Sequence, residues 1–294
     1  MMFRPLESYD QRVLSSSLSI SPDPDRLHFV HDALGNCVGL ANFAGRTREL
    51  VFESQVRLDH RPAPAFAGLD GDSRKGSYPF RYDEDDLPDL QQSMQRRHAD
   101  QACVVDAWAR RFLRPNGRTP IHTLLADMTQ AIHSEFHYAK RLHGAAQTPA
   151  QTLELGSGAC RDFALLMMEA VRGLGFAAQF VSGYIHTPPR HAGPLTRLGG
   201  GHTHAWVRVY LPVCGWMEFD PTNGIVGNAD LVRVAIARDP RQALPLCGSW
   251  SGAPSDFVGM DVEVDVSSDE DGAAPIVAPS MRQLENRVGV TLAG

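Results

Sequence analysis

A long hydrophobic run is the first of several features that this chain lacks. Its 294 residues contain no apolar stretch near the roughly 18 residues that a membrane-spanning helix needs. The N-terminal segment MMFRPLESYD carries charged residues and has no apolar centre of the kind found in signal peptides. We therefore expect no membrane partner and a cytoplasmic location.

An excess of basic charge is also absent. The chain has 28 Lys and Arg against 34 Asp and Glu, a formal net charge of −6, and its basic residues are scattered. Proteins that bind nucleic acid need a basic surface that neutralises phosphates, so we expect no nucleic-acid partner. A glycine-rich phosphate loop between a strand and a helix is missing too, which argues against a nucleotide-binding fold.

Closely spaced cysteines are the third absence. The chain has five cysteines, all far apart in sequence and without a C-x-x-C pair. An odd number at wide spacing is typical of a reducing cytoplasm and predicts neither structural disulfides nor a zinc cluster.

The chain is otherwise of ordinary globular composition, with 43% hydrophobic and 21% charged residues. Helical patterns over residues 102–112 and 121–136 precede runs with strand periodicity, which predicts an α+β fold with a helical half and an antiparallel sheet. We expect four parts in chain order: an all-β N-terminal module (residues 1–60), a linker or irregular wrap (61–100), a catalytic core (101–226), and a strand-rich C-terminal extension with an acidic tail (227–294).

One cysteine, Cys160, stands at the predicted start of a helix. The apolar residues that follow it share one helical face: Phe163, Leu166, Met167, Ala170, Val171 and Leu174. Ser157 or Gly158 can serve as the N-cap, and Gly173 or Gly175 can end the helix. The positive end of the helix dipole, with Arg161 beside it, favours a thiolate at Cys160. A small buried cysteine that fills a gap is the alternative, so its partners decide.

The segment GHTHAWVRVYLPVCGWMEFDPTNG supplies candidate partners. His204 begins one predicted strand and Asp220 ends the next, with a hairpin turn around residues 212–215. If the loop has an odd number of residues, His204 and Asp220 share a face and stand opposite or diagonal to each other. An even loop would place them on opposite faces unless a bulge intervened.

A metal site is a weaker alternative for the same segment. His202 and His204 form an H-x-H pair, which can bind a metal ion. Only Asp220 and His191 could complete such a site, and no second histidine or cysteine pair supports it. We expect no metal and no organic cofactor.

Three motifs in this order resemble the core of bacterial transglutaminase-like proteins. They are GSGACRD around Cys160, THAW around His204 and GWMEFDPT around Asp220. The resemblance implies a papain-like transglutaminase core with Cys160 as nucleophile, His204 as base and Asp220 as the residue that orients the base. Residues 1–61 resemble the family's N-terminal region, which usually begins with an extra strand; here MMFRP stands where its second strand would run.

The resemblance implies a cysteine-dependent acyl transfer on amide bonds of a peptide or protein substrate. Attack by the thiolate would form a thioester, which water or an amine then resolves, so both hydrolysis and transamidation stay open. We expect residues 61–100 and 186–203 to set specificity, with Tyr184 and Trp206 as candidate pocket walls. The alternative is a non-catalytic protein with the same fold that binds or scaffolds a partner.

Overall fold

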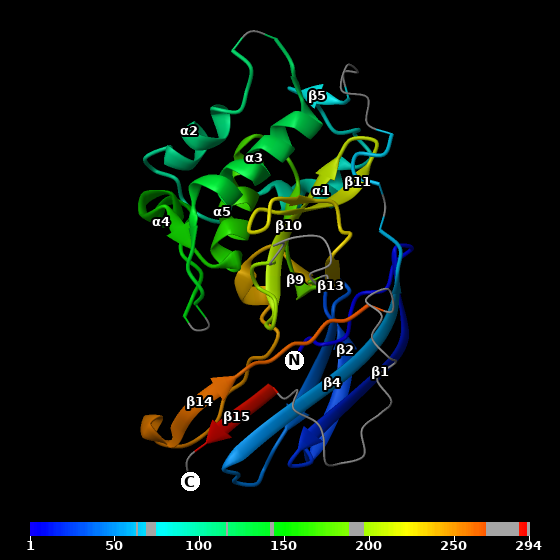
Figure 1. The fold of residues 1–294 in the computed structure, drawn as a ribbon, viewed down its shortest axis with the longest axis vertical. Helices are drawn as coiled ribbons and strands as arrows, with labels where there is room; N and C mark the ends of the chain where they lie inside the picture. The colour runs from blue at the N-terminus through cyan, green and yellow to red at the C-terminus, as the bar shows by residue number, and fades with distance from the viewer. Residues whose placement is uncertain are drawn as a thin grey trace.

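The chain forms two packed parts in the computed structural model, which describes residues 1–62, 64–68, 75–115, 117–141, 144–187, 197–268 and 288–292. Figure 1 shows β-strands in its lower half, helices in its upper half, and a five-stranded sheet between them. Within the described residues, no helix combines the length and apolar character of a membrane span.

The first part is built from strands at both ends of the chain. Strand β1 (Gln11–Ser21) pairs antiparallel with β4 (Glu49–His60), and the sheet continues in the order β1-β4-β15-β14 with β14 (Phe257–Asp261) and β15 (Val288–Leu292). The C-terminal strands thus complete a sheet begun by the N-terminal ones.

A separate hairpin of β2 (Arg26–His31) and β3 (Cys37–Asn42) accompanies this sheet. Residues 1–10 form no named strand; the carbonyl of Met1 accepts a hydrogen bond from the backbone N–H of Gly39 at 2.8 Å. Phe3 is buried, and its ring meets that of Phe52 at 6.2 Å. The N-terminal residues therefore pack on the module as irregular chain.

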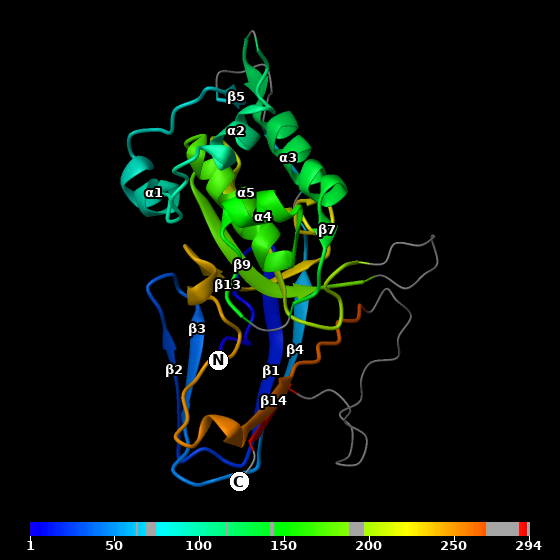
Figure 2. The ribbon, with the colours of Figure 1, turned by 90° about the vertical axis from the view of Figure 1, so that its left-hand side faces the viewer.

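The second part packs most of its helices against one face of an antiparallel sheet (Figure 2). The helices of the described chain are α1 (Leu87–Met94), α2 (Val104–Arg110), α3 (Ile121–Glu135), α4 (Pro149–Leu155) and α5 (Cys160–Gly173). The sheet has the order β12-β11-β10-β9-β13, with β9 (Ala178–Ile185), β10 (His204–Leu211), β11 (Gly215–Asp220), β12 (Ile225–Val226) and β13 (Leu231–Ala237). Two short pairs complete it: β5 (Ser77–Tyr78) with β6 (Thr119–Pro120), and β7 (His137–Tyr138) with β8 (Ser157–Gly158).

Two of these elements cross the boundaries that we expected from sequence. Strand β13 pairs with β9, so the core sheet extends past residue 226. Helix α1 lies inside the expected irregular wrap at 61–100, with Pro88 in its first turn and Leu90 buried. Its eight residues are too short and too polar to show a clear apolar face in sequence.

Helix α5 is the centre of the core and is buried on every side from Asp162 to Arg172. Its predicted apolar face packs on the side chains of β10 that alternate inward, among them Ala205 and Val207. The helix ends at Gly173. As predicted, a glycine terminates it: Gly175, two residues later, adopts the left-handed region with φ of +88°.

The opposite side of α5 carries charge that the sequence pattern does not reveal. Glu169 and Arg172 are both fully buried, and Arg172 Nη1 donates to Glu169 Oε1 at 2.7 Å. Glu169 Oε2 also accepts from the backbone N–H groups of Arg97 and His98. The helix is thereby fixed to the segment that precedes α2.

A second buried network joins the two parts of the molecule. Arg233, on β13, ion-pairs with Asp10 at 2.8 Å and also contacts Glu218 on β11. The side-chain amide of Gln11 makes two hydrogen bonds to the backbone of Arg233: Nε2 donates to the carbonyl at 2.8 Å, and Oε1 accepts from the N–H at 2.9 Å. The guanidinium therefore neutralises carboxylates from both parts at once.

This network predicts that Arg233→Met destabilises the protein strongly. The substitution leaves Asp10 and Glu218 buried without their cation, a change that costs about 3–5 kcal/mol. Urea denaturation measures the loss. Arg61→Met, which removes an exposed ion pair with Asp59, is the matched control and should change the free energy of unfolding by at most about 1 kcal/mol. Equal effects of the two substitutions would show that the buried network is not what joins the parts.

Candidate active site

The structure places Cys160 in the first turn of α5, as the sequence predicts, but with a different cap. The N-cap residue is Ala159 rather than Ser157 or Gly158. Asp162 takes over the capping role, since its Oδ2 accepts from the backbone N–H of Ala159 at 2.8 Å. Arg141 donates to both oxygens of Asp162, at 2.7 and 2.8 Å. The start of α5 is therefore held by a buried carboxylate.

Arg161 turns away from the position that we expected for it. Its Nη1 donates to the carbonyl of Arg141 at 2.7 Å, and its Nη2 donates to that of Gly144 at 3.2 Å. The guanidinium fixes the segment that carries Arg141. Its role beside Cys160 is that of a structural anchor.

His204 and Asp220 meet across the β10–β11 hairpin. Leu211 pairs with Gly215, so the loop holds three residues, the odd number that sets both side chains on one face. His204 Nε2 lies 2.8 Å from Asp220 Oδ2, and both residues are almost completely buried. The contact that we inferred from strand periodicity is present.

Burial and charge act in opposite directions on this pair. Complete burial lowers the pKa of His204, but the charge and hydrogen bond of Asp220, together with Cys160, raise it to about 10. Burial likewise raises the pKa of Asp220, while His204, Asn223 and the backbone N–H of Thr222 lower it below its usual value. The pair is therefore stable as imidazolium and carboxylate at neutral pH.

Cys160 is the second group that acts on the imidazole ring, since it helps to raise the pKa of His204. Helix α5 runs along β10 in the same direction. Cys160, at the start of α5, raises the pKa of His204 at the start of β10. Ala177, just after the end of α5, accepts a hydrogen bond from the N–H of Tyr210 near the end of β10. His204 Nδ1 has no hydrogen-bond partner among the described residues. One ring nitrogen is thus held by Asp220, and the other is left for a proton exchange with the thiol.

The loop before β10 covers this free nitrogen closely. A Cβ atom built on Gly199, whose φ is +91°, would lie 2.5 Å from His204 Nδ1. Gly201, with φ of +80°, has nothing within 4 Å of such an atom. Only glycine fits at 199, because any side chain would displace the ring.

Asn223 is a site residue that sequence reasoning missed. Its Nδ2 donates to Asp220 Oδ2 at 2.7 Å and to the carbonyl of Leu198 at 3.0 Å, and its Oδ1 accepts from Leu198 N–H at 2.7 Å. The side chain thus ties the loop over His204 to the carboxylate behind it. Its signal was its position three residues after Asp220 in DPTN.

His133 supports the same turn from α3. Its Nδ1 lies 2.9 Å from the carbonyl of Thr222, next to Asn223. From sequence we assigned no role to this histidine. Its function is to hold the turn that follows β11, so it acts on the site through the position of Asn223.

Tyr138 is a candidate donor to the negatively charged oxygen that would form if Cys160 attacked a carbonyl. In the parallel β7–β8 pair it stands beside Gly158, two residues before Cys160. Burial first, and then the charges of Cys160 and Asp220, raise its pKa to about 12, so the phenol keeps its proton. Two other residues that precede Cys160 have structural roles: Phe136 packs its ring on Phe163, and Gln151 caps α4.

The predicted pocket walls are packed residues. Trp206 is fully buried and stacks on His204 with ring centroids 5.9 Å apart. The hydroxyl of Tyr184 donates to the carbonyl of Phe3 at 3.3 Å. Of the loops that we expected to set specificity, residues 63, 69–74 and 188–196 lie outside the described residues.

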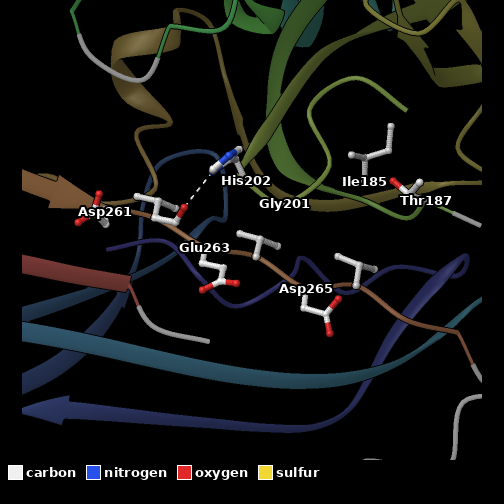
Figure 3. A pocket seen from close by; sticks show the side chains of 10 residues that line it. Ile185, Thr187, Gly201, His202, Asp261, Glu263 and Asp265 are labelled. Atoms are coloured by element: carbon white, nitrogen blue, oxygen red, sulfur yellow. Dashed lines mark hydrogen bonds between the residues drawn. The ribbon is translucent and has the colours of Figure 1, made fainter. Parts of the chain in front are cut away.

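His202 points toward the C-terminal segment (Figure 3). Its Nδ1 lies 2.9 Å from the carbonyl of Val262, and its Nε2 contacts Lys140. His191, the other candidate ligand, lies outside the described residues. Within the described part, no three His, Cys, Asp or Glu side chains are grouped to hold a metal ion.

Comparisons with known proteins show which families this chain resembles. Residues 107–221 match the profile of the transglutaminase-like superfamily, and residues 1–59 match the bacterial transglutaminase-like N-terminal region. A solved protein of Cytophaga hutchinsonii, named a "putative cysteine protease", superposes with a TM-score of 0.60 at 18% identity, covering 82% of this chain and 77% of that one. The α+β, papain-like transglutaminase fold that we predicted is confirmed.

Residues 107–221 therefore form a transglutaminase-like domain, and the chain as a whole is similar to bacterial transglutaminase-like proteins. The uncharacterized protein Rv2569c of Mycobacterium tuberculosis is 27% identical over 268 residues, which are 89% of this chain and 84% of the relative. The uncharacterized protein ML0607 of Mycobacterium leprae is 27% identical over 169 residues, 52% of this chain but only 59% of the relative's own length. Membership of residues 107–221 in this superfamily supports a cysteine-dependent catalytic role.

The coupling between His204 and Asp220 predicts a specific pH dependence of stability. The raised pKa of His204 means that its contribution to stability is complete below the unfolded value of about 6.5. The contribution is lost as pH rises through the folded pKa of about 10. The melting temperature of the wild type should therefore exceed that of His204→Gln by a margin that shrinks between these two pH values.

Differential scanning fluorimetry at several pH values measures this margin. His31→Gln, a substitution at an exposed position on β2, is the control and should show a small offset that stays constant. A margin for His204→Gln that is also constant from pH 6 to 10 would contradict the buried imidazolium.

Proposed function

We propose that this chain is a cysteine-dependent enzyme that transfers acyl groups from amide bonds of a peptide or protein, with Cys160 as nucleophile, His204 as base and Asp220 as the group that orients and charges the base. The observation that carries the proposal is the state of the His204 ring: Nε2 is held by Asp220, Nδ1 has no hydrogen-bond partner among the described residues, and Cys160 is close enough to raise the pKa of the ring. Superfamily membership of residues 107–221 supports it.

The first half of the reaction forms a thioester. In the resting site the proton already lies on His204 Nδ1, and the sulfur of Cys160 attacks the carbonyl carbon of the substrate amide as the thiolate. The carbon–nitrogen bond then breaks, and His204 returns the proton to the leaving amine. The N–H groups of the first turn of α5 and the Tyr138 hydroxyl are the donors that we assign to the negative oxygen of the intermediate.

The second half releases the acyl group. Water or a second amine attacks the thioester carbon, His204 Nδ1 accepts the proton of the attacking group, and the sulfur of Cys160 leaves as the thiolate beside the protonated ring. Water gives a peptidase or amidase, and an amine gives a transamidase. A peptide or protein substrate and a cytoplasmic location remain predictions.

The proposal is tested by incubating the protein with glutamine-containing and other peptide libraries, with and without a primary amine, and reading products by mass spectrometry. We expect products of hydrolysis or transamidation from the wild type and a thioester adduct on Cys160. Cys160→Ser should lose both, because an alcohol in this place is a far weaker nucleophile. Cys214→Ser is the matched control. That thiol lies in the turn between β10 and β11 and donates to the carbonyl of Ala67.

Products from Cys160→Ser at the wild-type rate would overturn the assignment of the nucleophile. A folded wild type that alkylates slowly at Cys160 and yields no product from any library would favour the binding or scaffold protein instead.

The close cover over His204 predicts a sharp difference between two glycines. Gly199→Ala should slow alkylation of Cys160 by iodoacetamide, because the added Cβ displaces the base; a misplaced catalytic group of this kind costs on the order of 10- to 100-fold. Gly201→Ala carries a similar backbone strain from its positive φ but meets no atom, so Cys160 should keep its reactivity. Equal alkylation rates in the two variants would contradict the role given to the loop.

A further inference from the structure

A second small pocket lies on the far side of the core sheet from α5, where the N-terminal residues meet the β10–β11 hairpin. Its volume is about 220 Å³. Arg208 and Trp216 line it from the hairpin, Tyr9 and Asp10 from the N-terminal segment, and Ala65 from the segment after β4. It therefore lies at the junction of the two parts of the molecule.

Arg208 is held in this pocket by neutral groups. Its Nε and Nη2 both donate to Oε1 of Gln179, at 2.9 and 2.6 Å, and its guanidinium carbon lies 4.6 Å from the centre of the Trp216 ring. Its Nη1 makes no hydrogen bond within the described part of the chain and is not fully buried. One face and one edge of the cation are thus fixed, and one donor is left over.

Two other shielded arginines of this protein each hold a carboxylate. Arg172 pairs with Glu169 at 2.7 Å and Arg141 with Asp162 at 2.7 Å. Arg208 stands directly across from Glu218 in the sheet, but Glu218 is taken by Arg233. Arg208 and Arg233 both line the pocket, and of the two it is Arg208 whose neighbouring carboxylate serves another residue.

This arrangement disfavours the charged form of Arg208 and leaves room for an anion. Burial lowers the pKa of Arg208 to about 10, an effect that Glu218 and Asp10 oppose and Arg233 adds to. A partly buried cation without a carboxylate partner lowers the stability of the fold, and a bound anion that accepts from Nη1 would offset this loss. Asp10 and Glu218 border the same pocket, so a singly charged anion fits better than a dianion.

We propose that this pocket is a binding site for a carboxylate, from a small organic acid or from the C-terminus of a peptide, with Arg208 Nη1 as donor and Trp216 as wall. The site is separate from the proposed catalytic one. Trp206, fully buried, lies between His204 and Arg208 on the same sheet face, and the two residues stand about 13 Å apart at ~3.3 Å per residue. A ligand here would act on the joint between the N-terminal module and the core.

Isothermal titration calorimetry at constant ionic strength tests the proposal. The protein is the Cys160→Ala variant, so that the outcome is independent of catalysis. The probes are sodium acetate and the tripeptide Gly-Gly-Ala with a free or an amidated C-terminus. We expect saturable binding of acetate. A free tripeptide that binds tighter than acetate, with no binding of its amide, points to a peptide terminus; a free tripeptide that does not bind points to a small acid.

Arg208→Gln should weaken acetate binding about 10- to 100-fold, the range expected for one lost hydrogen bond to a charged group. Arg238→Gln, which removes a half-buried arginine bonded to Gln92, is the matched control and should bind as the parent does. If Arg208→Gln fails to fold, quenching of Trp216 fluorescence by acetate in the parent, and its absence in Trp216→Phe, replaces it. No saturable acetate binding, or equal binding by both arginine variants, would overturn the proposal.

Discussion

The buried contact between His204 and Asp220 is the interaction on which the rest of the site depends. Neither group could be charged at this depth alone, since isolating an ion in a protein interior costs several kcal/mol. Each makes the other's charge stable, and Asn223 and the N–H of Thr222 satisfy the remaining carboxylate lone pairs. The same contact sets the orientation of the ring, which leaves Nδ1 for Cys160.

Several distant elements serve to hold this contact and the cysteine in place. The three-residue turn between β10 and β11 sets the faces of the two strands, and Asn223 joins the turn after β11 to the loop that covers His204. At the other side of the site, Asp162 and Arg141 hold the first turn of α5. The site is therefore built from a helix start, two strand ends and two loops, each fixed by a buried polar contact.

Much of the fold and the pairing of the site could be predicted from sequence because both depend on local periodicity. The helical spacing after Cys160 gave α5, and the period of two in β10 and β11 gave the shared face of His204 and Asp220. What could not be predicted depends on contacts between distant segments. The capping role of Asp162, the clamp made by Asn223 and the support from His133 involve loops whose spacing carries no period. Strand β13 was missed as part of the core sheet because its partner, β9, lies about 50 residues earlier, beyond the reach of pattern reasoning.

The central claim is that His204 is held as an imidazolium between Asp220 and Cys160 in the resting protein. Nitrogen-15 NMR of the His204 ring over pH 5 to 10 tests this most directly, because the shifts of Nδ1 and Nε2 report the proton on each atom. The account predicts that both nitrogens stay protonated well above pH 7 and that Asp220→Asn lowers the pKa of the ring. A ring that loses a proton near its ordinary value of about 6.5, in the wild type and in Asp220→Asn alike, would contradict it.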